Sequence, residues 1–541
     1  MMNSEPVSRL GTHDVFNQPE PKRAKDYWVS DRGVREHAAA AGARTQHLAQ
    51  VGATWGGEAL LQAAEDARRD LPRLKLFDRS GRRVDEVEFH PGYHALMAAG
   101  LEAGYASAAW DGQAGGHATH AALVYYQAQL EPGVACPLTM TYAAVPALAA
   151  APEVDKIWTP RLTSGIYDPS LKPIDAKQGA TLGMAMTEKQ GGSDVRANTT
   201  VAHRDGNQYR LRGHKWFCSA PMCDGFLTLA QTGAGLTCFL VPRWLEGERN
   251  SMRLQRLKNK LGNQANASSE IEYHDALAYR VGDEGAGVRT IIEMVHHTRL
   301  DTVLAPAGLM RAALAEAHWW VNGRSAFQKR LIDQPLMRSV LADLAVDTEA
   351  ALSVGMMLAA AFDREDDESR AFARIGVALA KYLNNKRCIG VIAEAMEVLG
   401  GMGYIEETPM PMIYREAPLN GIWEGSGNVI CLDVLRALMR EPAAGEALMN
   451  VLHSVVGSDA RYDAALQAHT ARWPRLPAEA DARWFTESLA NLLTAASLIK
   501  AAPSAVAEGF VTSRVVGDRG SFSGAVSGLQ VDDILARLAV D

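Results

Sequence analysis

Residues 184–195, MAMTEKQGGSDV, gather hydroxyl groups and glycines between two apolar stretches. The Thr187 and Ser193 hydroxyls and the backbone N–H groups of Gly191 and Gly192 could hydrogen-bond the edge of a heteroaromatic ring and a pyrophosphate. The two glycines would also let the backbone approach such a ligand closely. The alternative is a surface loop ahead of a helix or strand, because turn residues are common between elements.

Trp216 is a second candidate, in the run HKWFCS that follows an alternating stretch. An indole at the end of a strand could stack on a flat ring. The alternative is an ordinary aromatic residue of the core. The loop and the tryptophan together favour a binding site for a flavin, which offers both a flat ring and a pyrophosphate.

Glu424, in IWEGSGNV, stands at the start of an apolar helix. A helix N-terminus favours a carboxylate, so Glu424 is either a capping group or a base. A carboxylate that acts as a base near neutral pH has to be desolvated. We predict no metal site, because His296 and His297 are adjacent and no other His or Cys stands at ligand spacing.

The composition of the 541 residues is that of a globular protein, with 47% hydrophobic and 22% charged residues. The length suggests three or four domains. The net charge of −8 gives no global attraction to nucleic acid or acidic membranes. The N-terminal residues contain no apolar signal segment, and the longest apolar runs are shorter than the ~20 residues that span a bilayer, so we expect a cytoplasmic protein without a membrane segment. We expect reduced, mostly buried thiols, because no CxxC pair occurs among Cys136, Cys218, Cys223, Cys238, Cys388 and Cys431.

Three kinds of segment follow one another along the chain. Residues 31–150 are rich in alanine and leucine and predict helices, with 71–92 as a connecting segment. Two hairpin signals and one further strand between 180 and 280 predict a small β domain. Four long amphipathic segments then fit a helix bundle, and the last hundred residues also look helical. The predicted domains are 1–180, helical; 181–282, β; 283–440, four-helix bundle; and 441–541, an additional helical domain.

Six motifs in this order resemble the acyl-CoA dehydrogenase family: MTEKQGGSDV, GHKWFCS, KNKLGNQANASSEIEYHD, RSAFQKRLIDQPLM, AMEVLGGMGY and IWEGSGNV. The similarity covers roughly 130–440. The start THDVFNQP, the continuation SDVRANTT and the additional C-terminal helices resemble the alkylation-response branch of that family. The resemblance implies a mainly helical fold with a central β-barrel or sandwich and noncovalently bound FAD.

The resemblance also implies a set of cofactor contacts. The family usually has threonine at Cys218, so that one hydrogen bond is in doubt, and Ser219 is a substitute. Gln328 replaces the family's glycine after Phe327, and Glu397 replaces a commoner glutamine. Arg324 and Phe327 would reach the FAD of a neighbouring subunit, which implies a homotetramer built as a dimer of dimers. The implied cofactor residues are Met184, Met186, Thr187, Gly192, Ser193, Trp216, Phe217, Cys218, Arg324, Phe327, Glu397, Gly400, Gly401, Trp423, Ser426 and Asn428.

In the family the glutamate of IWEG removes the α-proton of an acyl-CoA, so the resemblance makes Glu424 the catalytic base for α,β-desaturation. Some branches place the base on another helix, but Thr298 occupies that position here. Ser193, Arg299 and Gly425 would border the acyl-CoA. Acyl chain length and the acceptor of the flavin's electrons, an electron-transfer flavoprotein or oxygen, stay open.

The alkylation-response branch is associated with binding of double-stranded DNA through its C-terminal helices. Residues 441–541 hold 8 Lys and Arg against 12 Asp and Glu, which is a poor composition for a DNA-binding domain. Arg436, Arg440 and Arg519 are the candidate DNA contacts, and ordinary solvated surface charge is the alternative. Two functions therefore stay open: a metabolic dehydrogenase, and a DNA-protective or scavenging flavoprotein whose catalysis is vestigial.

Overall fold

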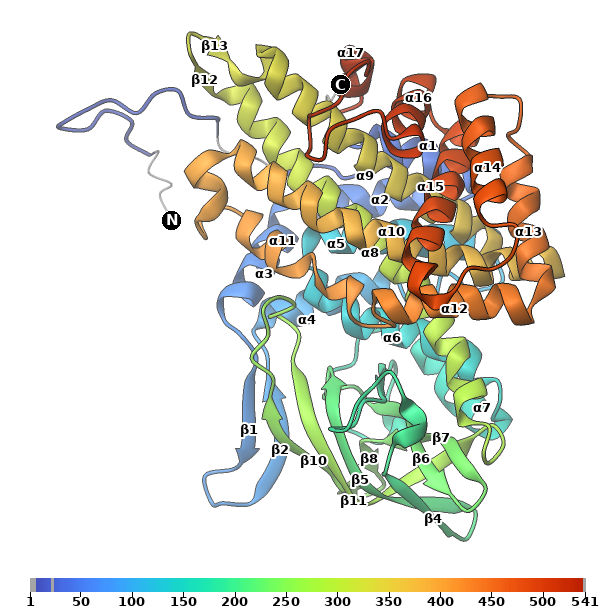
Figure 1. The fold of residues 1–541 in the computed structure, drawn as a ribbon. Helices are drawn as coiled ribbons and strands as arrows, with labels where there is room; N and C mark the ends of the chain where they lie inside the picture. Colours follow the sequence, from blue (N-terminus) through green and yellow to red (C-terminus); the bar gives the residue numbers. More distant parts are fainter. Residues whose placement is uncertain (1–5, 21–23, 539–541) are drawn as a thin grey trace.

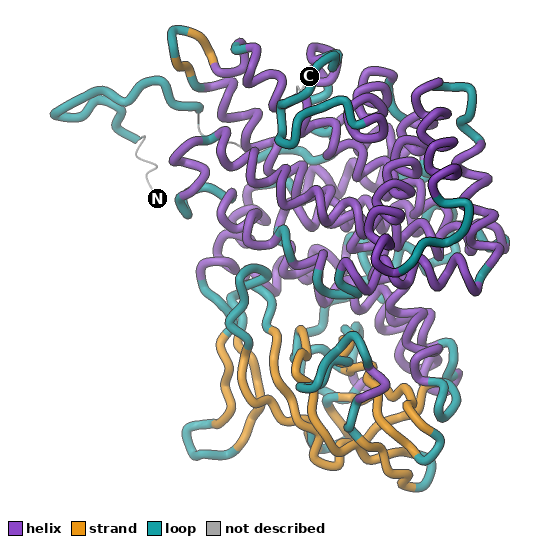
Figure 2. Tube along the Cα trace, in the orientation of Figure 1, coloured by secondary structure: helices purple, strands orange, loops and turns teal. Residues whose placement is uncertain are grey.

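The computed structural model describes residues 6–20 and 24–538. Helices form a large upper body, and all strands except β12 and β13 form a smaller body below it (Figures 1 and 2). Three N-terminal helices begin at a proline, which suits the first helical turn because its missing N–H has no partner there. The helices of this region are α1 Arg32–Ala40, α2 Thr45–Trp55, α3 Glu58–Arg69, α4 Pro91–Glu102, α5 Gly116–Leu130, α6 Pro132–Leu148 and α7 Pro152–Leu162.

The predicted connecting segment 71–92 is wrong in part, because it contains a β-hairpin. Strands β1 Arg73–Phe77 and β2 Arg83–Glu88 pair antiparallel, and β1 and β2 lie beside β10 of the sheet (Figure 1). The turn is held by Asp78, whose carboxylate accepts from the backbone N–H groups of Ser80 and Arg82. The high density of charged residues concealed the alternation of this short, exposed hairpin.

The β domain contains the two predicted hairpins. Asp205 pairs with Gln208, and Thr232 pairs with Gly235. The strand β7 pairs with both β6 and β11, so that β11, β5, β4, β6 and β7 form a closed ring. Closure leaves few free edges and gives a small barrel. The strands are β3 Leu182–Ala185, β4 Val201–Asp205, β5 Gln208–Ser219, β6 Gly225–Thr232, β7 Gly235–Pro242, β8 Trp244–Leu245, β9 Glu248–Arg249, β10 Met252–Leu257 and β11 Ser268–Val281.

The four predicted long helices are present and pack on one another. They are α8 Gly287–Gly323, α9 Pro335–Phe362, α10 Asp367–Val398 and α12 Gly427–Arg440. Between them lie the short hairpin β12 Ser325–Ala326 and β13 Lys329–Arg330, and the helix α11 Met410–Glu416. Helix α9 is long and apolar enough to cross a membrane, but 78% of its most apolar window is buried. Packing within the bundle therefore accounts for its apolar composition.

The C-terminal helices cover the bundle on the side of α9, α10 and α12 (Figure 1). They are α13 Pro442–His453, α14 Ala460–Arg472, α15 Ala482–Ala501, α16 Ser504–Phe510, the π-helix η7 Val511–Val516 and α17 Val531–Ala536. Short 3₁₀ turns elsewhere are η1 Ile174–Ala176, η2 Val195–Ala197, η3 Leu331–Asp333, η4 Gly400–Tyr404, η5 Leu419–Gly421 and η6 Glu479–Asp481.

A buried ion network attaches this tail to α9. The Arg514 guanidinium lies 2.6 Å from carboxylate oxygens of both Asp343 and Asp347, and Arg387 also pairs with Asp347 at 2.6 Å. Burial raises the pKa of Asp347, but the two arginines outweigh it and lower that pKa to about 2. Arg519 belongs to the same network through Asp343, at 3.0 Å.

We predict that Arg514→Met destabilises the tail by about 3 kcal/mol, because it leaves two buried carboxylates short of a partner. The stabilisation from Asp347 is fully present above its ordinary pKa of 3.8 and is lost as pH falls through about 2. Hydrogen exchange of residues 504–516 between pH 7 and pH 2 would measure both effects. Arg475→Met, at an exposed residue of the tail, is the matched control. Equal exchange in the two variants would contradict the prediction.

Candidate active site

The glycine-rich loop after β3 is anchored by Glu188, which is fully buried. Its carboxylate accepts from Lys215 Nζ at 2.8 Å and from the Thr199 N–H at 2.7 Å. Burial favours a higher pKa, but the Lys215 charge and these hydrogen bonds lower the pKa of Glu188 to about 2. This ion pair was not predicted from the sequence, and it holds the loop against β5.

The remainder of the loop folds back on Thr187. The backbone N–H of Trp216 donates to the Thr187 carbonyl at 2.8 Å. A Cβ on Gly192 would lie 2.4 Å from the Thr187 hydroxyl oxygen, so only glycine fits there. The loop thereby forms a narrow cradle of backbone, with the Ser193 side chain exposed and those of Met184 and Met186 half-buried.

Trp216 and Phe217 present aromatic surface beside this cradle. Phe217 is 46% exposed, and Lys258 Nζ lies 3.2 Å from the centroid of the Trp216 ring. Cys218 is fully buried, and burial raises the pKa of its thiol to about 12. The structure therefore gives this predicted contact no access to a ligand on that surface, and the half-buried Ser219 is the better candidate.

The loop that carries Glu424 has an unusual backbone. Glu424 has φ of 57° and Gly425 has φ of 102°, a region that non-glycine residues rarely adopt. Three carbonyl oxygens of the loop accept hydrogen bonds from buried cations. Arg299 Nε donates to the Glu424 carbonyl at 3.1 Å, and Lys381 Nζ donates to those of Asn420 and Gly425, both at 2.9 Å. These contacts hold the strained conformation.

The Glu424 carboxylate accepts a hydrogen bond from the Thr298 hydroxyl at 2.7 Å. Desolvation raises the pKa of Glu424, while the Thr298 hydrogen bond and the charges of Arg299 and Lys381 partly oppose this. Burial also lowers the pKa of Lys381, to about 7. A half-buried carboxylate with a raised pKa is the chemical property that a general base requires.

Arg299 was predicted to border the acyl-CoA, but its guanidinium contacts other groups of the protein. Its guanidinium also pairs with Asp433 on α12 at 2.7 Å, and Arg374 pairs with the same carboxylate at 2.9 Å. With Nε on the Glu424 carbonyl, Arg299 holds the loop and the first turns of α12 together. The geometry thus favours a positioning role over direct contact with a substrate.

Three further predicted residues lie in or next to this loop. Trp423 is half-buried, and its indole N–H donates to the Asn420 side chain at 2.6 Å. Ser426 is the N-cap residue of α12, without a hydrogen bond from its side chain to the helix. Asn428 accepts from Arg483 of α15 at 2.8 Å, so the C-terminal helices reach the loop that carries the candidate base.

Two helices contact the β domain near the site: α6 contacts β3, and α11, which precedes the loop of Glu424, contacts the segment between β10 and β11. The Thr141 hydroxyl of α6 accepts from the Leu182 N–H of β3 at 3.2 Å. The side-chain amide of Asn263, between β10 and β11, donates to Glu416 of α11 at 2.9 Å. The KNKLGNQANASSE motif therefore ties the β domain to the segment that precedes Glu424.

The other predicted cofactor residues lie at a distance. Arg324 is the C-cap residue of α8 and follows Thr298 by 26 residues. It therefore lies roughly 39 Å along the helix from Thr298, the residue that contacts Glu424. Glu397 is exposed and lies about 24 Å along α10 from Lys381, and the exposed Gly400 and Gly401 follow that helix. A single chain therefore does not bring all the predicted residues together.

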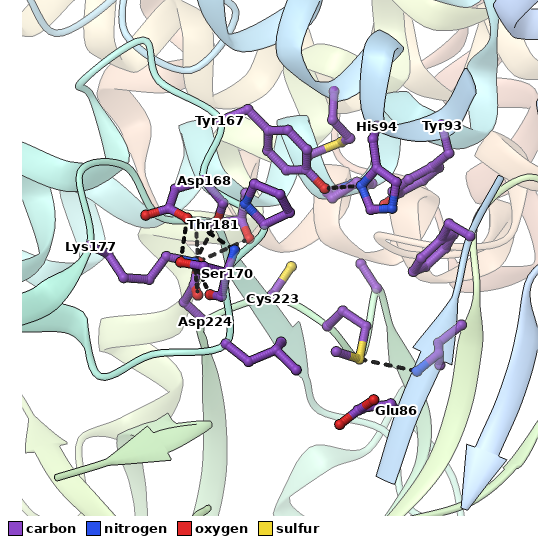
Figure 3. A pocket seen from close by; sticks show the side chains of 18 residues that line it. Glu86, Tyr93, His94, Tyr167, Asp168, Ser170, Lys177, Thr181, Cys223 and Asp224 are labelled. Atoms are coloured by element: carbon purple, nitrogen blue, oxygen red, sulfur yellow. Dashed lines mark hydrogen bonds and ion pairs between the residues drawn. The ribbon is translucent and has the colours of Figure 1, made fainter. Parts of the chain in front are cut away.

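A cavity of about 180 Å³ lies between α4 and the β domain (Figure 3). Its polar groups are mostly paired with one another: Lys177 Nζ donates to Asp224 at 2.6 Å and to two backbone carbonyls, and Tyr167 pairs with His94 at 2.8 Å. The lining residues include none of those predicted for the site. We interpret this cavity as a seam between two packed units.

Comparison with known proteins assigns the family. The family model for the N-terminal domain of the adaptive response protein AidB matches residues 17–169. Models of the acyl-CoA dehydrogenase middle and C-terminal domains match residues 183–276 and 285–439. The acyl-CoA dehydrogenase homologue AidB of Escherichia coli (strain K12) is 43% identical over 505 residues, which cover 92% of this chain and 93% of AidB. The chain belongs to the acyl-CoA dehydrogenase family.

Other relatives support this assignment. Acyl-CoA dehydrogenase family member 11 of Caenorhabditis elegans is 32% identical over 394 residues, or 68% of this chain and 63% of that protein. The solved apo form of Bd2924 superimposes with a TM-score of 0.82 at 27% identity, over 90% of this chain and 99% of that one. C. elegans ACDH-11, solved with C11-CoA, has a TM-score of 0.83 at 24% identity over 99% and 98% of the two chains and shows the same fold.

As a member of this family, the chain is an FAD-dependent acyl-CoA dehydrogenase. The residues around the cradle fit that cofactor. Gly192 lets the loop pack on Thr187, where a Cβ would collide, and Phe217 supplies exposed flat apolar surface beside it. The Thr187 and Ser193 hydroxyls add hydrogen-bonding groups beside them.

We predict that Thr298→Val raises the pKa of Glu424 further, because it removes a hydrogen bond that stabilises the carboxylate. Flavin reduction by an acyl-CoA requires the ionised base. The acidic limb of the pH profile of that rate should therefore move to higher pH. Thr302→Val removes a buried hydroxyl one turn along α8, where it bonds only the Arg299 carbonyl, and is the matched control. An unchanged limb in Thr298→Val would count against Glu424 as the titrating base.

Proposed function

We propose that this FAD-dependent dehydrogenase desaturates an acyl-CoA between Cα and Cβ, with Glu424 as the base. The observation that supports this proposal is the half-buried carboxylate, held by Thr298 at 2.7 Å in a loop with left-handed backbone. Such strain is maintained where the surrounding structure over-determines it, and it is concentrated at functional sites.

In the proposed reaction, the Glu424 carboxylate takes the α-proton and becomes a carboxylic acid. The β-hydrogen leaves with its electron pair as hydride, and the electrons of the broken Cα–H bond form the new C=C bond. FAD, when bound, supplies the acceptor for this hydride. Thr298 donates to the carboxylate before the transfer, which keeps the base ionised and fixes its orientation. Arg299 and Lys381 hold the backbone on which the base stands.

We further propose that Trp216, Phe217, Thr187, Gly192 and Ser193 contact the flavin end of FAD. Arg324, Phe327, Glu397, Gly400 and Gly401 lie too far along α8 and α10 to serve the same site. They would instead bind the FAD of a neighbouring subunit in a homotetramer. The exposed tip of the β12–β13 hairpin, where Phe327 is 93% exposed, supports this arrangement.

We propose a biological role in the response to DNA alkylation, which rests on the likeness to AidB along nearly the whole chain. A DNA contact has less support. Arg519 is neutralised by Asp343, and among the tail arginines Arg514 and Arg537 are likewise paired. Arg436 and Arg440, exposed on α12, are the better candidates. A cytoplasmic location fits this role.

For the catalytic proposal, the first test is an anaerobic titration of the yellow holoprotein with short, branched and long acyl-CoAs. One of them should bleach the visible flavin band of the wild type. Glu424→Gln should keep its FAD but lose about 10²–10⁴-fold in the rate of bleaching, which is the contribution of a positioned base. Glu446→Gln, an exposed glutamate on α13, is the control.

Prompt bleaching in Glu424→Gln would refute the base assignment. FAD bound and chemically reducible, but bleached by no acyl-CoA even in the wild type, would refute the dehydrogenase reaction and favour a protective role without catalysis.

For the DNA proposal, we expect weak, nonspecific binding of a short duplex that falls steeply between 50 and 200 mM salt, because binding by arginines releases counterions. Arg436→Ala with Arg440→Ala should weaken binding and flatten the salt dependence, whereas Arg475→Ala should not. Fluorescence anisotropy of a labelled duplex measures both. No binding at low salt would exclude the DNA contact while leaving the enzymatic proposal intact.

A further inference from the structure

The N-terminal arm, residues 6–20, stands away from the helical body (Figure 1). It forms a small turn of its own, in which the Val15 N–H donates to the Ser8 carbonyl at 2.7 Å and the Leu10 N–H donates to the His13 carbonyl at 2.9 Å. Apart from Pro19, every residue of the arm is exposed. The sequence motif THDVFNQP lies in this arm and has no part in the catalytic proposal.

The base of the arm is fixed to the β12–β13 hairpin by Asn17. Its side-chain amide donates to the Ser325 carbonyl at 2.9 Å and accepts from the Ser325 N–H at 2.7 Å. Arg324 donates to the Asn17 carbonyl at 3.0 Å. Pro19 packs on Gly323, where a Cβ would lie 2.6 Å from the Pro19 Cα. Arm and hairpin therefore project from the body as one unit.

This unit exposes large apolar side chains on both of its parts. Phe16 is 79% exposed on the arm, next to Asn17, and Phe327 is 93% exposed at the tip of the hairpin. Val7 and Val15 add further exposed apolar surface. An isolated two-stranded turn is at best marginally stable in water, so a partner that covers these apolar side chains would stabilise it.

The charges of the arm argue against a polyanion as its partner. Arg9 is its only Lys or Arg, and it pairs with Asp14 at 3.8 Å, while Glu20 adds a second acid. Nucleic acids and acidic membranes both require an excess of basic residues. A protein surface is the partner that suits exposed phenylalanine and valine.

We propose that the arm packs on a second copy of this chain, beside that copy's FAD site. Phe16 is the apolar anchor of this contact, and Asn17 connects the arm to the hairpin. This inference rests on the proposed function, in which Arg324 and Phe327 reach the neighbour's FAD. The hairpin lies roughly 39 Å along α8 from its own Glu424, so it serves a site in another copy. Because Asn17 joins the arm to the hairpin, the arm must meet the same copy.

The test uses full-length holoprotein and two readouts, molar mass by sedimentation during dilution and the dissociation constant of FAD by fluorescence. Phe16→Ala removes the apolar anchor, and Asn17→Ala removes the bidentate contact with Ser325. Each should raise the subunit dissociation constant about tenfold or more, as expected for an interface anchor, and should loosen FAD in parallel. Phe522→Ala, at a phenylalanine 80% exposed in the C-terminal tail, is the matched control.

The arm stands outside the folded body, so these variants should keep the wild-type melting profile when fully assembled. An oligomeric wild type whose mass and FAD affinity are unchanged in Phe16→Ala and Asn17→Ala would overturn the arm inference alone. A wild type that is monomeric with tightly bound FAD would overturn it together with the proposed subunit-crossing cofactor site. Loss of the oligomer in Phe522→Ala as well would also contradict it, because the effect would then not be specific to the arm.

Discussion

Two buried side chains, those of Arg299 and Lys381, hold the loop that carries Glu424 by its backbone carbonyl oxygens. Glu424 adopts a left-handed backbone that costs about 1–3 kcal/mol for a residue with a Cβ, so the conformation persists only if its surroundings enforce it. The two side chains come from α8 and α10, the longest helices of the bundle. The bundle is therefore the rigid support of Glu424, the candidate base, whose carboxylate also accepts a hydrogen bond from Thr298.

On the β side of the candidate site, a buried ion pair likewise supports a loop. Glu188 and Lys215 are both fully buried and paired at 2.8 Å, and they fix the glycine loop from beneath. Of the loop's polar side chains, that of Ser193 is exposed and could meet a ligand. Buried charged residues therefore build the supports on both sides of the candidate site.

The sequence predicted the class of fold, its order and the loop that carries Glu424, because long apolar periodicity and glycine-rich turns are local signals. Individual contacts were less predictable. Arg299 and Cys218 were assigned to ligands by their position in motifs, but their partners, Asp433 and the barrel core, are distant in sequence. The β1–β2 hairpin was missed because charged residues mask its alternation. The domain boundaries at 180, 282 and 440 and the cofactor contacts stay predictions.

The length of α8 carries a consequence for assembly. The helix starts at the β domain, passes the base at Thr298 and ends at Gly323, next to the hairpin. At 1.5 Å per residue, Thr298 and Arg324 are roughly 39 Å apart along this helix, longer than a dinucleotide can span. Residues at these two positions can therefore serve one FAD only if they come from different chains. On this view the cofactor itself is part of the subunit interface, and retention of FAD and assembly of the oligomer should be thermodynamically linked, because a ligand that binds only the assembled state stabilises that state.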